Sequence, residues 1–129
     1  MAELYYPELS YKIVGILFEV YNKLGYGLRE KIYQQTIASC LKEKNIKFKE
    51  QFKVEFRFKG RIIKKLYFDF LIEDKIVLEI KVGEDFNKEN IAQVYEYLKA
   101  KNLRLGIIAN FTKKGIKTKR VIYKGKNKN

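Results

Sequence analysis

Apolar residues at helical spacing open the chain. After the only proline, Pro7, they recur every three or four positions until Gly25 and Gly27 interrupt them. This spacing predicts a first helix that the glycines end. A second stripe predicts a helix from about Leu28 to Lys44. Its members are Ile32, Tyr33, Thr36, Ile37, Cys40 and Leu41.

The middle of the chain changes to the two-residue period of strands. Apolar and charged residues alternate over residues 48–58, and Lys59-Gly60 then predicts a turn. Two further strands, about 61–72 and 75–82, flank the acidic turn Glu73-Asp74. The order predicts an antiparallel meander of three strands.

The last third of the chain predicts a helix followed by strands. Asn87 suits the N-cap of a helix with Ile91, Val94, Tyr95 and Leu98 on its apolar face. The mainly apolar run 103–109 predicts a buried strand. A further edge strand is predicted around Ile116, Val121, Ile122 and Tyr123. These elements describe one α/β domain over residues 1–123, followed by a disordered basic tail, 124–129.

Length and composition favour a single folded domain. The chain has 129 residues, and typical domains have roughly 100–150. A hydrophobic fraction of 47% excludes a disordered chain and predicts folding alone or as a small homo-oligomer. The apolar runs fall far short of the ~20 residues that span a bilayer. With one cysteine and no signal peptide, a cytoplasmic location is expected.

The charge balance points to a polyanionic partner. Lys and Arg outnumber Asp and Glu by 28 to 15, which gives a net charge of +13. Such a field attracts nucleic acid, although a lysine-rich surface can also serve only solvation. Eight of the basic residues follow Asn110. Those predicted to contact phosphates are Lys113, Lys114, Lys117, Lys119 and Arg120.

The chain contains no histidine, which restricts the chemistry available to it. Histidine is the commonest general base and zinc ligand, so Ser–His, Cys–His and His–metal nuclease sites are excluded. A hydrolase built from this sequence must use carboxylates, Lys, Tyr and a hard cation that prefers oxygen ligands.

Two acidic residues lie symmetrically about the turn between the second and third strands. A three-residue loop pairs Asp69 with Glu79, whereas a two-residue loop shifts the register and aims them at opposite faces. Facing carboxylates repel each other unless a cation such as Mg²⁺ or Mn²⁺ lies between them. Lys81 shares the face of Glu79, where its ammonium group would orient water or stabilise phosphate charge.

A plainer interpretation competes with this site. Glu79 and Lys81 can form the solvated face of an amphipathic strand, since Glu-x-Lys arises by chance in a lysine-rich protein. However, these charges interrupt an otherwise apolar run, 77–82, where burying a charge is costly without a purpose. Asp69 interrupts its own apolar segment in the same way.

Five short segments occur in a distinctive order along the chain. They are Gly27-Leu28-Arg29-Glu30-Lys31-Ile32-Tyr33, Phe68-Asp69-Phe70-Leu71, Glu79-Ile80-Lys81, Ala92-Gln93 with Tyr97-Leu98-Lys99, and Leu103-Arg104-Leu105-Gly106 to Asn110-Phe111. This set resembles the GxxExxY proteins, a branch of the PD-(D/E)XK nuclease superfamily. The resemblance covers nearly the whole chain and implies a restriction-endonuclease-like core with a mixed sheet flanked by helices.

The resemblance also implies residue roles. Asp69 and Glu79 correspond to ligands of Mg²⁺ or Mn²⁺, and Lys81 to the catalytic lysine. Glu30 corresponds to an accessory acid from the preceding helix, and Gln93 to a helix glutamine that approaches the same site. Together these roles imply a nuclease.

Simple chemistry offers alternatives for several of these residues. Glu30 is equally suited to stabilise the first turn of a helix, and Gln93 to pair with Tyr97 on a helix surface. Tyr33 is expected to be a core aromatic whose hydroxyl reaches a polar neighbour. The proline that usually precedes the first aspartate of the superfamily is replaced by Phe68, a departure that the superfamily tolerates.

The sequence therefore predicts a metal-dependent nuclease, with DNA favoured over RNA as substrate. Two alternatives remain. The domain can serve as a basic nucleic-acid-binding module with weak or no cleavage, or as a partner-binding component of a nucleic-acid-processing complex. Binding that depends little on salt would favour the last of these, because phosphate contacts release counterions.

Overall fold

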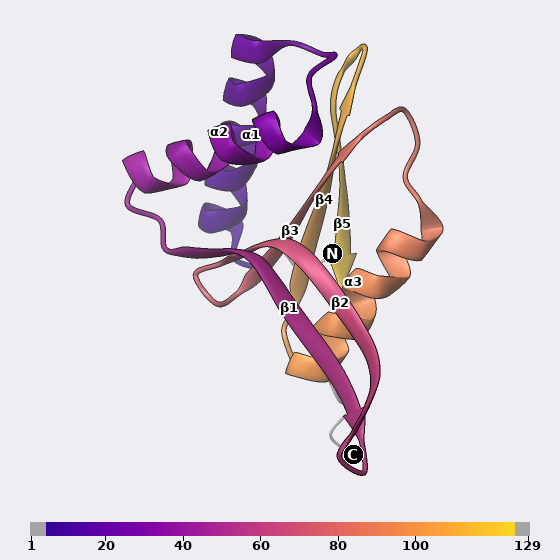
Figure 1. Cartoon of the computed structure of the whole chain (residues 1–129). Coiled ribbons are helices and arrows are strands. Elements are labelled where there is room, and N and C mark those ends of the chain that lie inside the picture. The colour runs from indigo at the N-terminus through magenta and orange to yellow at the C-terminus, as the bar shows by residue number, and fades with distance from the viewer. Residues whose placement is uncertain (1–4, 126–129) are drawn as a thin grey trace.

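The computed structural model describes residues 5–125 (Figure 1). Helices and strands follow one another in the predicted order, including the edge strand at the end. They are α1 (Pro7–Leu24), α2 (Glu30–Glu43), β1 (Phe48–Phe58), β2 (Arg61–Ile72), β3 (Ile76–Val82), α3 (Lys88–Lys101), β4 (Leu105–Thr112) and β5 (Gly115–Ile122). Within this part of the chain, no helix is both long and apolar enough to cross a membrane.

The strands form one mixed sheet in the order β1-β2-β3-β4-β5. The first three strands make the predicted antiparallel meander, and β5 is antiparallel to β4. Strands β3 and β4 are parallel, and α3 supplies the crossover that such a pair needs. Helices α1 and α2 pack on one face of the sheet and α3 on the other. The predicted α/β fold with a mixed sheet is confirmed.

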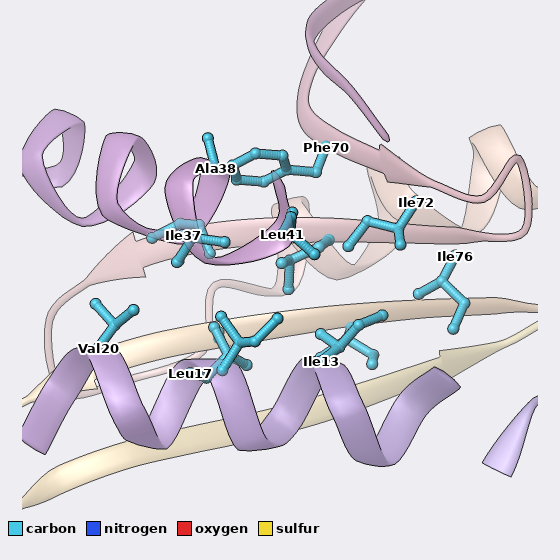
Figure 2. Close-up of a cluster of buried hydrophobic side chains, with 14 of the residues drawn as sticks. Ile13, Leu17, Val20, Ile37, Ala38, Leu41, Phe70, Ile72 and Ile76 are labelled. Atoms are coloured by element: carbon cyan, nitrogen blue, oxygen red, sulfur yellow. The ribbon is translucent and has the colours of Figure 1, made fainter. Parts of the chain in front are cut away.

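The larger core lies between the sheet and the α1–α2 pair. Figure 2 shows Ile13, Leu17 and Val20 of α1 turned toward Ile37 and Leu41 of α2. Their three- and four-residue spacing on α1 aligns them along one face of the helix. From the sheet, Phe70, Ile72 and Ile76 complete the cluster.

The smaller core lies under α3 and depends on a close approach to β4. A Cβ atom on Gly106 would lie 2.4 Å from Cγ1 of Val94 and 3.8 Å from Leu98. Only glycine therefore lets α3 come this near to the strand. Phe52 and Phe68 extend this core by packing on the Tyr97 ring, with centroids 5.6 and 4.9 Å away.

Two predicted core positions are wrong. Ile32 and Tyr95 are exposed, whereas Gln34 and Tyr97 are buried. In α2 the buried stripe is shifted by one residue relative to the prediction, because the residues that turn inward are Tyr33, Gln34, Ile37, Ala38 and Leu41. Tyr95 lies at the surface and makes an edge-to-face contact with Tyr123, with centroids 5.8 Å apart.

Several boundaries also differ from the prediction. Helix α2 begins at Glu30, and β4 continues past Ala109 to Thr112. The predicted edge strand near the end is β5. The predicted tail starts at Lys124, and its last residues, 126–129, lie outside the described part of the chain.

Candidate active site

Strands β2 and β3 separate soon after their hairpin turn. The connection is the three-residue one, since Ile72 pairs with Ile76 and Phe70 with Leu78. Beyond that last pair, β2 continues along β1, and β3 continues along β4. The two strands thus form a fork (Figure 1), and the next residues, Asp69 and Glu79, lie at its mouth.

The two acidic side chains take over the hydrogen bonds that the ladder no longer makes. The Asp69 backbone N–H donates to Oε1 of Glu79 at 2.7 Å. The Ile80 backbone N–H donates to Oδ2 of Asp69, also at 2.7 Å. Each carboxylate therefore binds the opposite strand. These crossed bonds fix both side chains at the fork.

Burial makes the negative charge of this pair costly. Glu79 is only 7% exposed, and its pKa is raised to about 8, chiefly because of this burial. The charge of Asp69 contributes to the rise, while the hydrogen bond from Asp69 N–H and the Lys81 ammonium oppose it. The pKa of Asp69 is also raised, chiefly by burial, against the Ile80 hydrogen bond and Lys81.

Glu30 joins this pair from the first turn of α2. It is half-buried, and burial raises its pKa, with Lys81 opposing the shift and Asp69 adding to it. These electrostatic interactions place Glu30, Asp69, Glu79 and Lys81 in one cluster. Among the described residues, no side chain caps the α2 N-terminus by a hydrogen bond, and Glu30 lies in the first turn, where the helix dipole also favours an acid.

The segment before α2 is held by Tyr33. Gly25 and Gly27 have φ values of 69° and 106°, in the region that favours glycine. The buried Tyr33 hydroxyl donates to the Gly25 carbonyl at 2.6 Å and accepts from the Leu28 N–H at 3.3 Å. Its ring stacks on Phe111, with centroids 4.1 Å apart. Tyr33 thus anchors to the sheet the loop that delivers Glu30.

Tyr33→Phe is expected to destabilise the protein by about 1 kcal/mol, because the Gly25 carbonyl and the Leu28 N–H lose their partner. Urea unfolding at equilibrium measures this change. Tyr11→Phe is the matched control, since Tyr11 is 81% exposed. Equal stability of the two variants would show that the Tyr33 hydroxyl does not hold the loop.

A cleft of about 500 Å³ lies between α2 and the start of β1. Asp69 lies in its wall, together with Glu30, Lys31, Gln34, Gln35, Glu50 and Gln51. The sequence interpretation missed Gln34, which is buried here. Its position four residues after Glu30, on the same helical face, is the signal that would have found it.

Asn110 is a second residue that the sequence interpretation missed. It is the register partner of Lys81 in the parallel pair, and it is almost fully buried. Its Nδ2 donates to the carbonyls of Asp85 at 2.8 Å and Gly83 at 3.4 Å. Asn110 thereby holds the start of the connection from β3 to α3. A polar residue directly after the apolar run was the available signal.

Gln93 lies half-buried on α3, one turn before Tyr97. Within residues 5–125 it makes no hydrogen bond to the acidic cluster. Its predicted approach to the site stays a prediction.

The predicted phosphate contacts lie at and near the edge strand β5. Lys113 and Lys114 form the turn that follows β4, at the same end of the sheet as the loop after β3. Lys117 and Lys119 are exposed on β5. Arg120 differs from the lysines, because its Nη1 donates to Oγ of Ser10 on α1 at 2.7 Å.

The donor chemistry of the fork fits a hard divalent cation. Asp69 and Glu79 offer carboxylate oxygens, and a cation beside them would favour the ionised forms that burial penalises. Among residues 5–125, no group of three or more Asp, Glu or Cys side chains is arranged to hold a metal ion. Glu30 therefore stands near the pair without completing a three-residue ligand set.

Comparison with known proteins supports the fold and the family. Residues 7–121 match the PD-(D/E)XK nuclease superfamily. The chain belongs to this superfamily. The superfamily name spells a sequence motif. Its first D fits Asp69 on β2, and its (D/E)XK fits Glu79-Ile80-Lys81 on β3, although Phe68 occupies the position of the proline. PD-(D/E)XK nucleases generally use divalent metal ions.

One solved structure shares this fold. The crystal structure of SSO0001 matches this PD-(D/E)XK chain with a TM-score of 0.54 and 23% identity. The match covers 71% of this chain and 48% of the SSO0001 chain. An alkaline exonuclease from Laribacter hongkongensis, LHK-Exo, has 10% identity and a TM-score of 0.47, over 88% of this chain and 81% of its own. Among curated proteins, none matches significantly.

Proposed function

We propose that this chain is a cytoplasmic, metal-dependent nuclease that hydrolyses phosphodiester bonds of nucleic acid, with DNA preferred. The observation that carries the proposal is the crossed pair of Asp69 and Glu79 beside Lys81 at the fork. Membership of the PD-(D/E)XK superfamily supports the reaction class. The net charge of +13 supports a polyanionic substrate.

Asp69 and Glu79 are the residues that would hold Mg²⁺ or Mn²⁺. Such an ion supplies a Lewis acid that neutralises phosphate charge and makes a bound water more acidic. Zinc is not expected, because the chain has no histidine and one cysteine. The hydrogen bonds from Asp69 N–H and Ile80 N–H hold both carboxylates in place before substrate arrives.

The neighbouring residues have distinct proposed roles. The Lys81 ammonium stabilises the negative charge that develops on the phosphate, or orients the attacking water. Glu30 adds an accessory carboxyl group from α2. Gln93 is proposed to approach the same centre from α3, and Asn110 to keep the neighbouring loop in place.

The proposal is tested by incubating the protein with supercoiled, linear, single-stranded and branched DNA, and with RNA. Each substrate is offered with Mg²⁺, with Mn²⁺ and with EDTA. Cleavage that requires the cation and is absent with EDTA would support a nuclease. An absence of cleavage on every substrate would favour a basic binding module or a partner-binding component instead. Salt-sensitive binding would then distinguish the former from the latter.

Replacing Lys113, Lys114, Lys117 and Lys119 by Gln is expected to weaken nucleic-acid binding and flatten its salt dependence. Each phosphate contact that is lost reduces the slope of log K against log salt by about 0.9 on duplex DNA. Arg120 is left intact, because its bond to Ser10 joins β5 to α1. Binding titrations at several salt concentrations measure the slope. An unchanged slope would assign these lysines to solubility.

A further inference from the structure

The β1–β2 hairpin carries an exposed face beyond the fork. Lys53 pairs with Tyr67 across the two strands, and Glu55 pairs with Lys65. Tyr67 is 67% exposed. We call these residues, Lys53, Glu55, Lys65 and Tyr67, the hairpin track. In Figure 1 the distal turn of this hairpin projects away from α1 and α2.

The hairpin track is continuous with the cleft of the candidate active site. Phe68 packs in the α3 core, so its neighbour Tyr67 points away from α3. Phe70 packs instead in the α1–α2 core, which shows that the strand reverses its faces around Asp69. Gln51 lies between the register partners of Phe70 and Phe68 and has a positive φ of 50°.

This reversal leaves Asp69 open to the same side as Tyr67. Both Gln51 and Asp69 line the cleft under α2. The next outward positions along the two strands, Lys53 and Tyr67, are about 6.6 Å further on. A bound chain that leaves the cleft along the hairpin therefore meets the hairpin track first.

The charge of the hairpin suits a phosphate backbone. Residues 53–67 contain six Lys or Arg and one acid, Glu55. Glu55 pairs with Arg57 at 2.9 Å and Lys53 at 3.7 Å, and Lys64 pairs with Glu96 at 3.2 Å. Among the described residues, Lys65 of the track has no ion-pair partner. Charge complementarity thus favours a nucleic acid over a second, equally basic copy of the chain.

The exposed ring on this face favours unpaired bases. The aromatic rings on the inward face, Phe52 and Phe68, stack together at 5.6 Å, whereas Tyr67 contacts no other ring within residues 5–125. Basic strands that carry exposed aromatic side chains bind single strands, because each unpaired base offers a face for stacking. In a duplex those faces are covered by neighbouring bases.

We infer that the substrate includes an unpaired strand that lies along the hairpin track, with a base stacked on Tyr67 and phosphates at Lys53 and Lys65. The strand then enters the cleft at Asp69, where the proposed hydrolysis takes place. This inference rests on the proposed nuclease function for its biological meaning. Its physical content is binding, which is measured without cleavage.

The test is fluorescence anisotropy of the full chain in EDTA with two probes, labelled oligo-dT and a blunt duplex of equal length. Tyr67→Ala is expected to weaken oligo-dT binding roughly tenfold and to leave duplex binding nearly unchanged. Tyr67→Phe keeps the ring and is expected to bind like the parent. Tyr11→Ala, on α1, is the control for loss of an exposed tyrosine.

Three results would overturn the inference. The first is that Tyr67→Ala and Tyr11→Ala weaken oligo-dT binding equally, and the second is that Tyr67→Ala weakens binding of both probes equally. The third is that Tyr67→Ala changes the molar mass in light scattering, because the face would then be an interface between copies of the chain. Cleavage with Mg²⁺ or Mn²⁺ is measured separately. If Tyr67→Ala selectively loses oligo-dT binding and the parent never cleaves, the hairpin track is supported and the nuclease proposal is rejected. If the parent cleaves and Tyr67→Ala binds oligo-dT like the parent, the nuclease proposal is supported and the hairpin track is rejected.

Discussion

Lys81→Ala is expected to lose most cleavage activity, on the order of a hundredfold or more, while nucleic-acid binding changes little. The half-buried Lys81 side chain lies near Glu30, Asp69 and Glu79, as its effect on their pKa values shows. An ammonium group at this place acts mainly on the charge that develops during phosphodiester hydrolysis. The variant should therefore lower kcat rather than raise KM.

Steady-state kinetics and anisotropy on the same substrate separate these two effects. Lys12→Ala is the control, because Lys12 is exposed on α1 and far in sequence from the fork. The variant should also fold, since within residues 5–125 no hydrogen bond or ion pair depends on the Lys81 side chain. If Lys81→Ala cleaves like the parent, the lysine is a strand-surface residue and the proposed mechanism is wrong.

Glu79→Gln is expected to change how stability depends on pH and on metal. The folded-state pKa of Glu79 is about 8, against an ordinary value of 4.5, so the folded protein binds this proton more tightly than the unfolded chain. Stability therefore falls as the pH rises from about 4.5 to 8. At about 1.4 kcal/mol per pKa unit, the loss is on the order of a few kcal/mol.

The Gln side chain removes this ionisation but keeps an oxygen that accepts from Asp69 N–H. In EDTA at pH 8 or above, the variant should thus be more stable than the parent, and below pH 4.5 the two should be alike. Added Mn²⁺ should raise the Tm of the parent by mass action and that of the variant much less. Thermal melts across pH, with and without Mn²⁺, measure both effects.

The metal proposal depends on the response of the parent. If the parent gains no stability at any millimolar Mn²⁺ concentration, with or without nucleic acid, the metal site is to be abandoned in favour of the binding module. A Glu43→Gln variant controls for the loss of one acidic charge, because Glu43 is exposed at the end of α2.

The order of elements was readable from hydrophobic periodicity, but the register at the site was not. Sequence spacing allowed both a two-residue and a three-residue connection between β2 and β3. The structure has Glu73 and Asp74 at φ values of 52° and 56°, a left-handed conformation that is uncommon for Glu and that Asp adopts more readily. The register of Phe70 with Leu78 follows from this local backbone choice.

The residues that line the cleft could not be predicted from the sequence for a different reason. Gln34 was overlooked because Glu50 and Gln51, which line the cleft with it, come from a strand that only tertiary packing brings beside α2. The exposed Ile32 shows the same limit, since an apolar stripe does not fix the rotation of a helix to within one residue. Likewise, the two-residue period of a strand does not reveal that β2 reverses its faces between Phe68 and Phe70.

The crossed bonds at the fork constrain how this domain can evolve. Positions 69 and 79 need a side-chain oxygen that accepts a backbone N–H, whatever else they do. Asn and Gln meet that need without the negative charge that a cation requires. Each amide is one nucleotide change away from its acid, so a single substitution can yield a folded descendant without the metal chemistry. Selection for catalysis and selection for folding therefore act on the same two side chains, and only catalysis requires the acid.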